Sequence, residues 1–252
     1  MKKVKLIEEK DLTWIVLNRE KLRNAIDVDV MDQLLEALHL AKINTSKAVV
    51  LIGEGNAAFC SGGDLSVFHE LKTEQQALGM LSKMQNVLEE IFYFPKLTVS
   101  ALNGTAVGGG CELATSCDLR IAAPHVKVGF IQGSLGITTG WGGASMLYER
   151  LPQPVAMEML MTSRVYKADE ARALGFLQGI ILKEPFIEGV REWLAPYLKV
   201  ENGVIAAYKH RFVDKVSRDD LSTRMKEEVA LCAKLWETDE HHQAVDAFLN
   251  RT

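Results

Sequence analysis

The amino-acid sequence predicts an α/β fold that ends in a helical segment. Three observations support this class. Short apolar runs typical of strands alternate with amphipathic helical stretches as far as about Ala123. Beyond Gly142 the pattern is helical almost throughout. The chain, at 252 residues, is also long enough to bury a substantial core.

The first half of the chain supplies the strands. The two strands nearest the N-terminus are expected to pair as a hairpin. Apolar residues then recur at helical spacing after Asp27 and Asp29, either of which can cap a helix at its N-terminus. The predicted strands are residues 3–8, 13–17, 47–53, 96–102 and 118–122, and the predicted helices are residues 28–41 and 75–91.

The second half is predicted to be helical, with a largely polar turn at residues 199–203 before its last three helices. We therefore divide the chain into a core at 1–200 and a C-terminal helical segment at 201–252. An apolar stripe on this segment is interpreted as an oligomerisation surface (Leu221, Met225, Val229, Cys232 and Trp236). The predicted helices are residues 143–149, 154–161, 167–174, 185–198, 204–216, 221–236 and 240–249.

Composition and charge narrow the function classes. The 48% hydrophobic and 25% charged residues are ordinary for a soluble globular protein, and the formal net charge of −4 argues against nucleic-acid binding. No apolar run approaches the roughly 20 residues of a membrane helix. The N-terminal residues lack the features of a signal or transit peptide. We therefore expect a cytoplasmic protein with no nucleic-acid or membrane partner.

The cysteines and histidines indicate no metal site. The four cysteines have neither metal-ligand nor disulfide spacing, so we expect them to be reduced and buried or half-buried. His39, His241 and His242 have no partner spacing for a metal or a catalytic triad, and we interpret them as surface or helix-face residues.

The most informative segment is NGTAVGGGCEL at residues 103–113, where a predicted strand leads into a glycine triplet that begins a helix. Glycines 108–110 allow backbone N–H groups to approach a ligand closely, and the first N–H groups of a helix lack internal partners. Glu112 follows one turn later. A second loop, at residues 57–65, also leaves a strand through small residues. Two such loops can direct one N–H each at a common point, which would form an oxyanion hole.

These segments resemble the crotonase superfamily, also called the enoyl-CoA hydratase/isomerase family. The resemblance rests on four motifs in order: LNR with NA (residues 17–19 and 24–25), AFCSGGDL (58–65), NGTAVGGGCELATSCDLRIA (103–122) and GITTGWGG (136–143). It implies a crotonase-like spiral of ββα units with a C-terminal helical segment. It also implies a coenzyme A thioester as substrate, no separate cofactor, and a homotrimer or homohexamer.

The resemblance implies roles for particular residues. The oxyanion donors fall on the N–H groups of Gly63 and Gly109. Family hydratases manage one water with two glutamates; the first matches Glu112, but Gln132 stands at the position of the second. An amide cannot take or give a proton at neutral pH, so ordinary two-carboxylate hydration is not available.

An oxyanion hole with one carboxyl group suits decarboxylation of a malonyl-type acyl-CoA, because the enolate forms without removal of a proton. The tract FIQGSLGITTGWGG (residues 130–143) resembles the corresponding tract of methylmalonyl- and ethylmalonyl-CoA decarboxylases. Trp141, within this tract, is a candidate for the wall of the acyl pocket.

The resemblance also implies contacts to coenzyme A. Lys21 and Arg23 are candidates for its phosphates, and Arg251 for a contact near the C-terminus. The backbone from Ser61 through Asp64 to Leu65 would follow the pantetheine and adenine.

Three functions remain open from the sequence. The first is an acyl-CoA decarboxylase that stabilises an enolate. The second is an enoyl-CoA hydratase or isomerase that tolerates Gln132. The third is an acyl-CoA-binding protein without catalysis, against which the presence of Glu112 argues, since binding alone needs only the amides.

Overall fold

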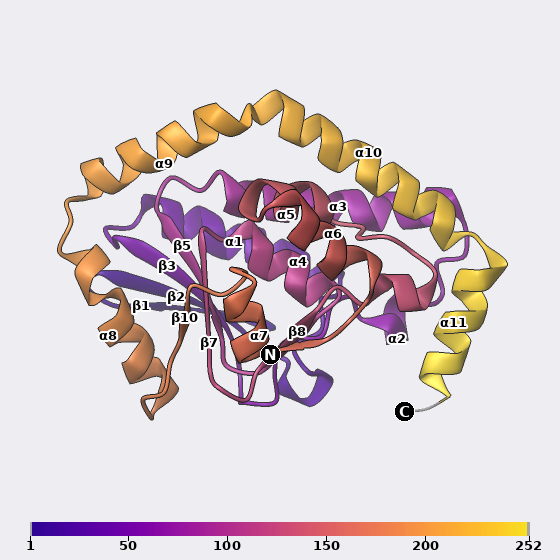
Figure 1. Cartoon of the computed structure of the whole chain (residues 1–252), viewed down its shortest axis with the longest axis horizontal. Helices are drawn as coiled ribbons and strands as arrows, with labels where there is room; N and C mark the ends of the chain where they lie inside the picture. The colour runs from indigo at the N-terminus through magenta and orange to yellow at the C-terminus, as the bar shows by residue number, and fades with distance from the viewer. Residues whose placement is uncertain (1, 251–252) are drawn as a thin grey trace.

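The computed structural model describes residues 2–250, which form two β-sheets and the helices packed on them (Figure 1). The larger sheet has the strand order β1-β2-β3-β5-β7-β10, and the smaller has the order β4-β6-β8-β9. All neighbours are parallel except β1–β2 and β8–β9. The strands are Val4–Glu8 (β1), Leu12–Leu17 (β2), Ala48–Gly53 (β3), Ala58–Cys60 (β4), Leu97–Leu102 (β5), Thr105–Val107 (β6), Leu119–Ala122 (β7), Lys127–Gly129 (β8), Tyr166–Lys167 (β9) and Gly179–Ile180 (β10).

The chain alternates between the two sheets, so that each turn of a spiral adds one strand to each sheet and then a helix. β3 is followed by β4, β5 by β6, and β7 by β8, with the first member of each pair in the larger sheet. This confirms the predicted α/β class and the spiral of ββα units. The N-terminal hairpin is also confirmed, since β1 and β2 pair antiparallel from Val4↔Leu17 to Glu8↔Thr13.

The helices begin at recognisable caps. The Asp27 side chain accepts a hydrogen bond from the Val30 N–H and caps α1, and Thr73 with Gln76 forms a capping box at the start of α3. The helices of the first three-quarters of the chain are Val28–Ile43 (α1), Leu65–Phe68 (α2), Glu74–Phe92 (α3), Gly109–Ser116 (α4), Gly143–Arg150 (α5), Gln153–Met161 (α6), Ala168–Ala173 (α7) and Phe186–Leu198 (α8), with 3-10 turns at Glu20–Leu22 (η1) and Gln132–Leu135 (η2).

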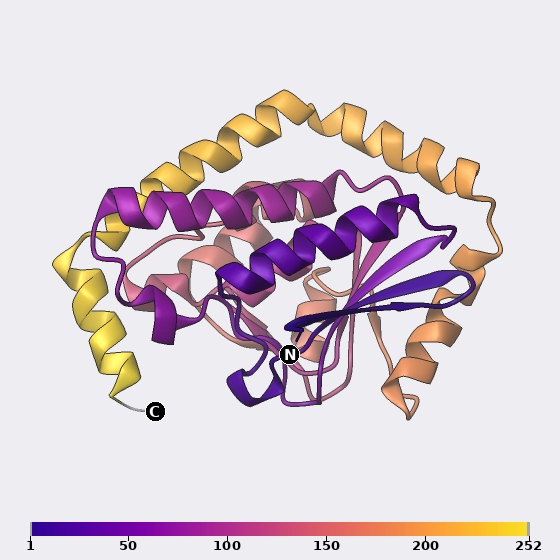
Figure 2. The ribbon, with the colours of Figure 1, turned by 180° about the vertical axis from the view of Figure 1, so that it is seen from behind.

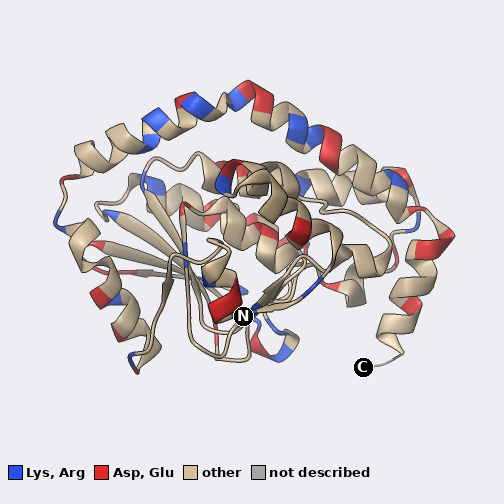
Figure 3. Ribbon diagram, viewed as in Figure 1, with Lys and Arg blue, Asp and Glu red and all other residues tan. Residues whose placement is uncertain are grey.

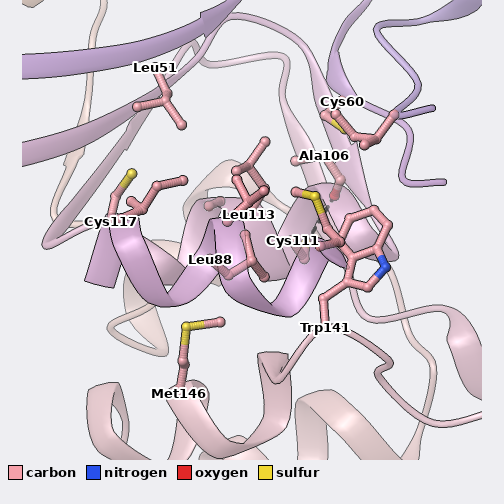
Figure 4. Packing of buried hydrophobic residues seen from close by; sticks show 14 of the residues in the cluster. Leu51, Cys60, Leu88, Ala106, Cys111, Leu113, Cys117, Trp141 and Met146 are labelled. Atoms are coloured by element: carbon pink, nitrogen blue, oxygen red, sulfur yellow. Dashed lines mark hydrogen bonds between the residues drawn. The ribbon is translucent and has the colours of Figure 1, made fainter. Parts of the chain in front are cut away.

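Helix α4 lies inside the protein. All eight of its residues are buried, and Figure 4 shows side chains packing around it from several elements, including Leu51, Leu88 and Met146. The cysteines are free and buried, as expected. A short helix this deep cannot tilt without disturbing the core, so its N-terminal glycines have fixed positions.

Three further helices follow in the described part of the chain: Asn202–Val216 (α9), Arg218–Trp236 (α10) and Asp239–Leu249 (α11). α9 and α10 arch over one side of the molecule, and Figure 2 shows α3 running beneath α10. α10 packs on α3 and α5, and α11 packs on η2. Charged residues of both signs are interspersed along α9 and α10 (Figure 3).

The apolar stripe of α10 corrects one prediction. Its members are buried within this chain, with exposed fractions of at most 5%, so they do not need a partner surface (Leu221, Met225, Val229, Cys232 and Trp236). Exposed apolar side chains lie instead elsewhere on the C-terminal helices, such as Tyr208 on α9 and Leu231 on α10. Among the helices of residues 2–250, none is both long enough and apolar enough to cross a membrane.

Candidate active site

The two glycine loops meet at the C-terminal ends of two strands of the smaller sheet, β4 and β6. β4 and β6 are parallel neighbours, so the loops that follow them leave the sheet on the same side. Gly62 and Gly108 have φ angles of +97° and +56°, which side chains rarely tolerate. A Cβ atom on Gly62 would lie 3.0 Å from the Gly109 nitrogen. The backbones of the two loops are therefore in direct contact.

The N–H groups of Gly63 and Gly109 are available to a ligand. Both residues line one cavity of about 150 Å³, and within residues 2–250 neither N–H donates a hydrogen bond. For Gly109 the reason is its place at the start of α4, where N–H groups have no partner inside the helix. Gly110 allows the two loops to approach each other, because a Cβ atom at this position would lie only 2.0 Å from the Cys60 carbonyl oxygen.

Trp141 forms one wall of the cavity, and its indole lies at the N-terminal end of α4 (Figure 4). A Cβ atom on Gly109 would lie 2.2 Å from its Cζ3 atom, so the ring covers the glycine closely. The rest of the wall is mostly apolar and includes Cys232 and Trp236 of α10 and Phe248 of α11. Among the described residues that line the cavity there is no Lys or Arg.

Glu112 extends from α4 and is 2% exposed. Its Oε2 accepts hydrogen bonds from the N–H groups of Trp141 and Gly143, at 2.8 and 2.9 Å. Its Oε1 accepts one from Gln132 Nε2 at 2.8 Å and a longer one from the Gly140 N–H at 3.3 Å. The carboxyl group is thus oriented by the loop before α5, while Glu112 still lines the cavity.

The surroundings make Glu112 a weak acid. Burial raises the pKa of its carboxyl group from 4.5 to about 8, and the Glu228 carboxylate adds to the increase, while the N–H donors of Trp141, Gly143 and Gly140 oppose it. A carboxyl group with this pKa is largely protonated at neutral pH. Glu112 can therefore serve as a proton donor.

Gln132 lies in η2 and is 7% exposed. Its Nε2 donates to Glu112, but its Oε1 is buried without a hydrogen-bond partner. A buried amide oxygen without a partner costs about 1–3 kcal/mol, so this atom is available to accept a hydrogen bond. The sequence comparison that paired Gln132 with Glu112 thus corresponds to a direct contact in the fold.

The remaining predicted residues fall into three groups. Ser61 and Leu65 line the cavity beside Gly63. Lys21 and Arg23 do not line it; both are exposed, and the Arg23 carbonyl accepts a hydrogen bond from the Ser61 N–H at 3.1 Å. Arg251 lies outside the described residues.

Asp64 also lies outside the cavity wall and has a structural partner. Its carboxylate pairs with Arg19 at 2.8 Å and accepts a hydrogen bond from the Ser66 N–H as the cap of α2. These contacts hold the loop that carries Gly63.

Two residues near the site were missed from the sequence. His241 is 2% exposed and lines the cavity, which corrects its interpretation as a surface or helix-face residue; its ring Nδ1 lies 2.7 Å from the Leu135 carbonyl oxygen. Glu228 receives hydrogen bonds at the start of α5. Neither has a sequence motif, because only the folding of α10 and α11 onto the core brings them here.

Comparison with known proteins agrees with this geometry. The family model described as "Enoyl-CoA hydratase/isomerase" matches residues 8–252. The chain belongs to the enoyl-CoA hydratase/isomerase family. Members of this family include enzymes named as decarboxylases and as hydratases, so this chain is an acyl-CoA enzyme of the lyase type.

Both decarboxylases and hydratases are among the proteins that are similar to this chain. An ethylmalonyl-CoA decarboxylase from Gallus gallus is 32% identical over 208 residues, covering 80% of this chain and 69% of the relative. A short-chain-enoyl-CoA hydratase from Clostridium acetobutylicum is 27% identical and covers 98% and 94% of the two chains. The crystal structure of an enoyl-CoA hydratase from Bacillus halodurans superimposes with a TM-score of 0.87 at 25% identity, covering 97% and 99%.

Proposed function

We propose that the protein decarboxylates a malonyl-type acyl-CoA, such as methylmalonyl- or ethylmalonyl-CoA. The observation that carries this proposal is the composition of the cavity. Among residues 2–250 it combines two available N–H groups with one carboxyl group, and an amide contacts that carboxyl group. This set can stabilise an enolate and protonate it, but it lacks the second carboxylate for ordinary hydration.

The reaction begins with the thioester carbonyl oxygen between the N–H groups of Gly63 and Gly109. As the substrate's C–C bond to its carboxylate breaks, CO₂ leaves and the electron pair moves through the α-carbon onto that oxygen. The two N–H groups stabilise the resulting enolate, and removal of one such donor typically costs about 10²–10³ in rate. An apolar wall without Lys or Arg among its described residues leaves the substrate carboxylate without a compensating cation, which favours its loss.

Glu112 then donates its proton to the α-carbon and recovers one from solvent. Its protonated form serves a second purpose, because a neutral carboxyl group does not repel the substrate carboxylate. In this form its O–H can donate to Gln132 Oε1 once that amide turns about its final bond. The turned amide places Nε2 where the unpartnered Oε1 now lies, and there Nε2 is free to donate a hydrogen bond.

The names of the relatives support two activities. Ethylmalonyl-CoA decarboxylases from Gallus gallus and Xenopus tropicalis are 32% and 30% identical to this chain. Hydratases cover more of the chain: a crotonyl-CoA hydratase from Syntrophomonas wolfei is 29% identical over 98% of it. An enoyl-CoA hydratase or isomerase is therefore the second candidate. A non-catalytic acyl-CoA-binding protein is the third and is disfavoured by the buried, oriented Glu112.

The resemblance to the family also suggests how this protein binds coenzyme A and how its subunits assemble. We propose that Lys21 and Arg23, exposed beside the Gly63 loop, contact the phosphates of coenzyme A, with Arg251 as a further contact. We also propose a homotrimer or homohexamer, with α9 at the subunit interface. Its exposed apolar residues support this assignment, since Tyr208 is 75% exposed and Val204 is 45% exposed.

The activities separate in one experiment. Purified protein is mixed with crotonyl-CoA and, separately, with methylmalonyl-CoA and ethylmalonyl-CoA, while thioester absorbance and CO₂ release are followed. We expect CO₂ from a malonyl-type substrate and little hydration. Rapid hydration of crotonyl-CoA without CO₂ release would replace the decarboxylase proposal by the hydratase one. No turnover of any of the three would favour the binding protein.

A further inference from the structure

Glu228 is a second carboxylate close to Glu112. It lies on α10, more than one hundred residues further along the chain, and is half-buried. It accepts four hydrogen bonds at the start of α5: from the N–H groups of Ala144 and Ser145, at 3.0 and 2.8 Å, and from the hydroxyls of Thr139 and Ser145, at 2.5 and 2.7 Å.

Glu112 and Glu228 therefore share the N-terminus of one helix. Glu112 accepts the N–H of Gly143, the first residue of α5, and Glu228 accepts the next two N–H groups. The N-terminus of a helix corresponds to about half a positive charge, which can offset part of one carboxylate but not two full negative charges. The pair is thus expected to hold one proton over a wide pH range.

The contacts indicate which residue holds that proton. Glu228 accepts from two hydroxyls in addition to two backbone N–H groups, and the two hydroxyl contacts are shorter than any that Glu112 makes. Hydrogen bonds from all four donors favour its charged form. A protonated Glu112 has an acceptor for its O–H group, because the Gln132 amide can turn and present its Oε1 atom. Glu112 is thus the better site for the proton.

Among residues 2–250, the thiols and the imidazole near the pair add no competing charge. Burial raises the pKa of the Cys111 and Cys232 thiols and lowers the pKa of the His241 ring, so all three are neutral at pH 7. Cys111 lies on α4, next to Glu112 in the chain, and Cys232 on α10 and His241 on α11 line the same cavity as Glu112. Burial raises the pKa of Glu228 as well, and its hydroxyl and N–H donors reduce this increase without reversing it.

We propose that Glu228 is a positioning residue for the reaction: its carboxylate, held at the start of α5, keeps the proton of the pair on Glu112. This inference rests on the proposed role of Glu112 as proton donor. It makes the protonation state of the active site depend on a residue of the C-terminal segment that does not line the cavity.

The first test is the pH profile of Glu228→Gln, measured with the substrate that the wild type turns over. Loss of the negative charge lowers the pKa of Glu112, so the alkaline limb of kcat should move acidward by about one pH unit, with at most a small change in KM. Glu227→Gln is the matched control, because it removes the same charge from an exposed neighbour on α10. Its profile should equal that of the wild type. A fall in kcat for Glu228→Gln with an unmoved limb would show a merely structural role and overturn the proposal.

A second variant keeps the carboxylate and removes its hydroxyl donors. In Thr139→Val combined with Ser145→Ala, Glu228 holds its charge less well and competes for the proton. The shared proton is then divided between the two carboxyl groups, so kcat near neutral pH should fall and should recover at lower pH, where both groups are protonated. This variant tests the proposal even where Glu228→Gln fails to fold, and a folded double variant whose kcat profile equals that of the wild type would contradict it.

A third measurement does not depend on turnover. Infrared difference spectra of the resting protein, with and without Glu112→Gln, isolate the band of the protonated Glu112 carboxyl group and its titration. That titration should shift acidward in the Glu228→Gln background. An unshifted titration would overturn the inference whatever the reaction is. Failure to release CO₂ with a normal infrared shift would instead reject only the decarboxylase proposal.

Discussion

Glu112→Gln should make the protein more stable at neutral pH while it removes most of the activity. The site can accommodate the change, because the oxygen of the substituted side chain still accepts from the N–H groups of Trp141 and Gly143. Its amide nitrogen then faces Gln132, whose own amide can turn to accept the hydrogen bond. Only the long contact to the Gly140 N–H, at 3.3 Å, has no replacement.

The magnitude follows from the pKa of Glu112. Its folded-state pKa of about 8 is above the ordinary 4.5, so between these values the folded protein holds a proton that the unfolded chain has released. The free energy of unfolding therefore falls as the pH rises, by about 1.4 kcal/mol per pH unit, or about 3 kcal/mol by pH 7. The variant avoids this loss. With about 1 kcal/mol offset by the missing hydrogen bond, its net gain is about 2 kcal/mol at pH 7.

Thermal unfolding of wild type and variant at pH 5, 6, 7 and 8 measures this effect. A gain of about 2 kcal/mol corresponds to a Tm higher by about 4–8 °C at pH 7 for a chain of this size. The gain should vanish near pH 5 and grow towards pH 8, while turnover falls by about 10²–10⁴ at all pH values. Glu227→Gln should show the pH dependence of the wild type. Parallel Tm curves for Glu112→Gln and wild type would refute the buried, raised-pKa carboxyl group, and full activity would remove Glu112 from the mechanism.

Three further predictions concern the glycine loops, the amide and the assembly. Gly110→Ala places a Cβ 2.0 Å from the Cys60 carbonyl oxygen, so kcat should fall by at least about 10²-fold, whereas Gly79→Ala, with no atom within 4 Å, should keep kcat and raise stability by about 0.5–1 kcal/mol; equal kcat in the two variants would contradict the close approach. Gln132→Glu should weaken the binding of malonyl-type substrates at neutral pH, because the introduced carboxylate and the substrate carboxylate are like charges a few ångströms apart, which costs on the order of several kcal/mol. Binding should recover partly at lower pH, and a weak hydration of crotonyl-CoA should increase. Unchanged decarboxylation kinetics would count against this prediction. Light scattering at micromolar concentration should give the mass of a trimer or hexamer, and a monomer would reject the proposed assembly.

The sequence predicted the long elements and the two glycine loops, because these depend on local signals. The helix 28–41 and the strand 96–102 each contain enough residues for a periodic pattern, and the glycine triplet has a local chemical meaning. Strands β4, β6 and β8 were not predicted as separate elements, since three residues are too few to show a period. They become strands only by pairing with one another.

Long-range contacts explain the other differences. Trp236 and its stripe on α10 were assigned to a subunit interface because periodicity shows that a face is apolar but not what covers it. The covering element is α3, far away in sequence. Glu228 and His241 were not predicted near the site for the same reason: a Glu on an amphipathic helix or a His near its start looks like any solvated residue until the tertiary fold places it. Gln132 was found only because the resemblance supplied a position to compare.

The position of α10 and α11 has a consequence for how the protein matures on the ribosome. The loops that carry Gly63 and Gly109 are synthesised well before Trp236 and Phe248, and domains tend to form in the order in which the chain emerges. A nascent chain can therefore form the two glycine loops while the cavity beside them still stands open to water. The cavity that buries Glu112 is closed only when α10 and α11 dock, so the raised pKa of this carboxyl group depends on helices that are synthesised after both glycine loops.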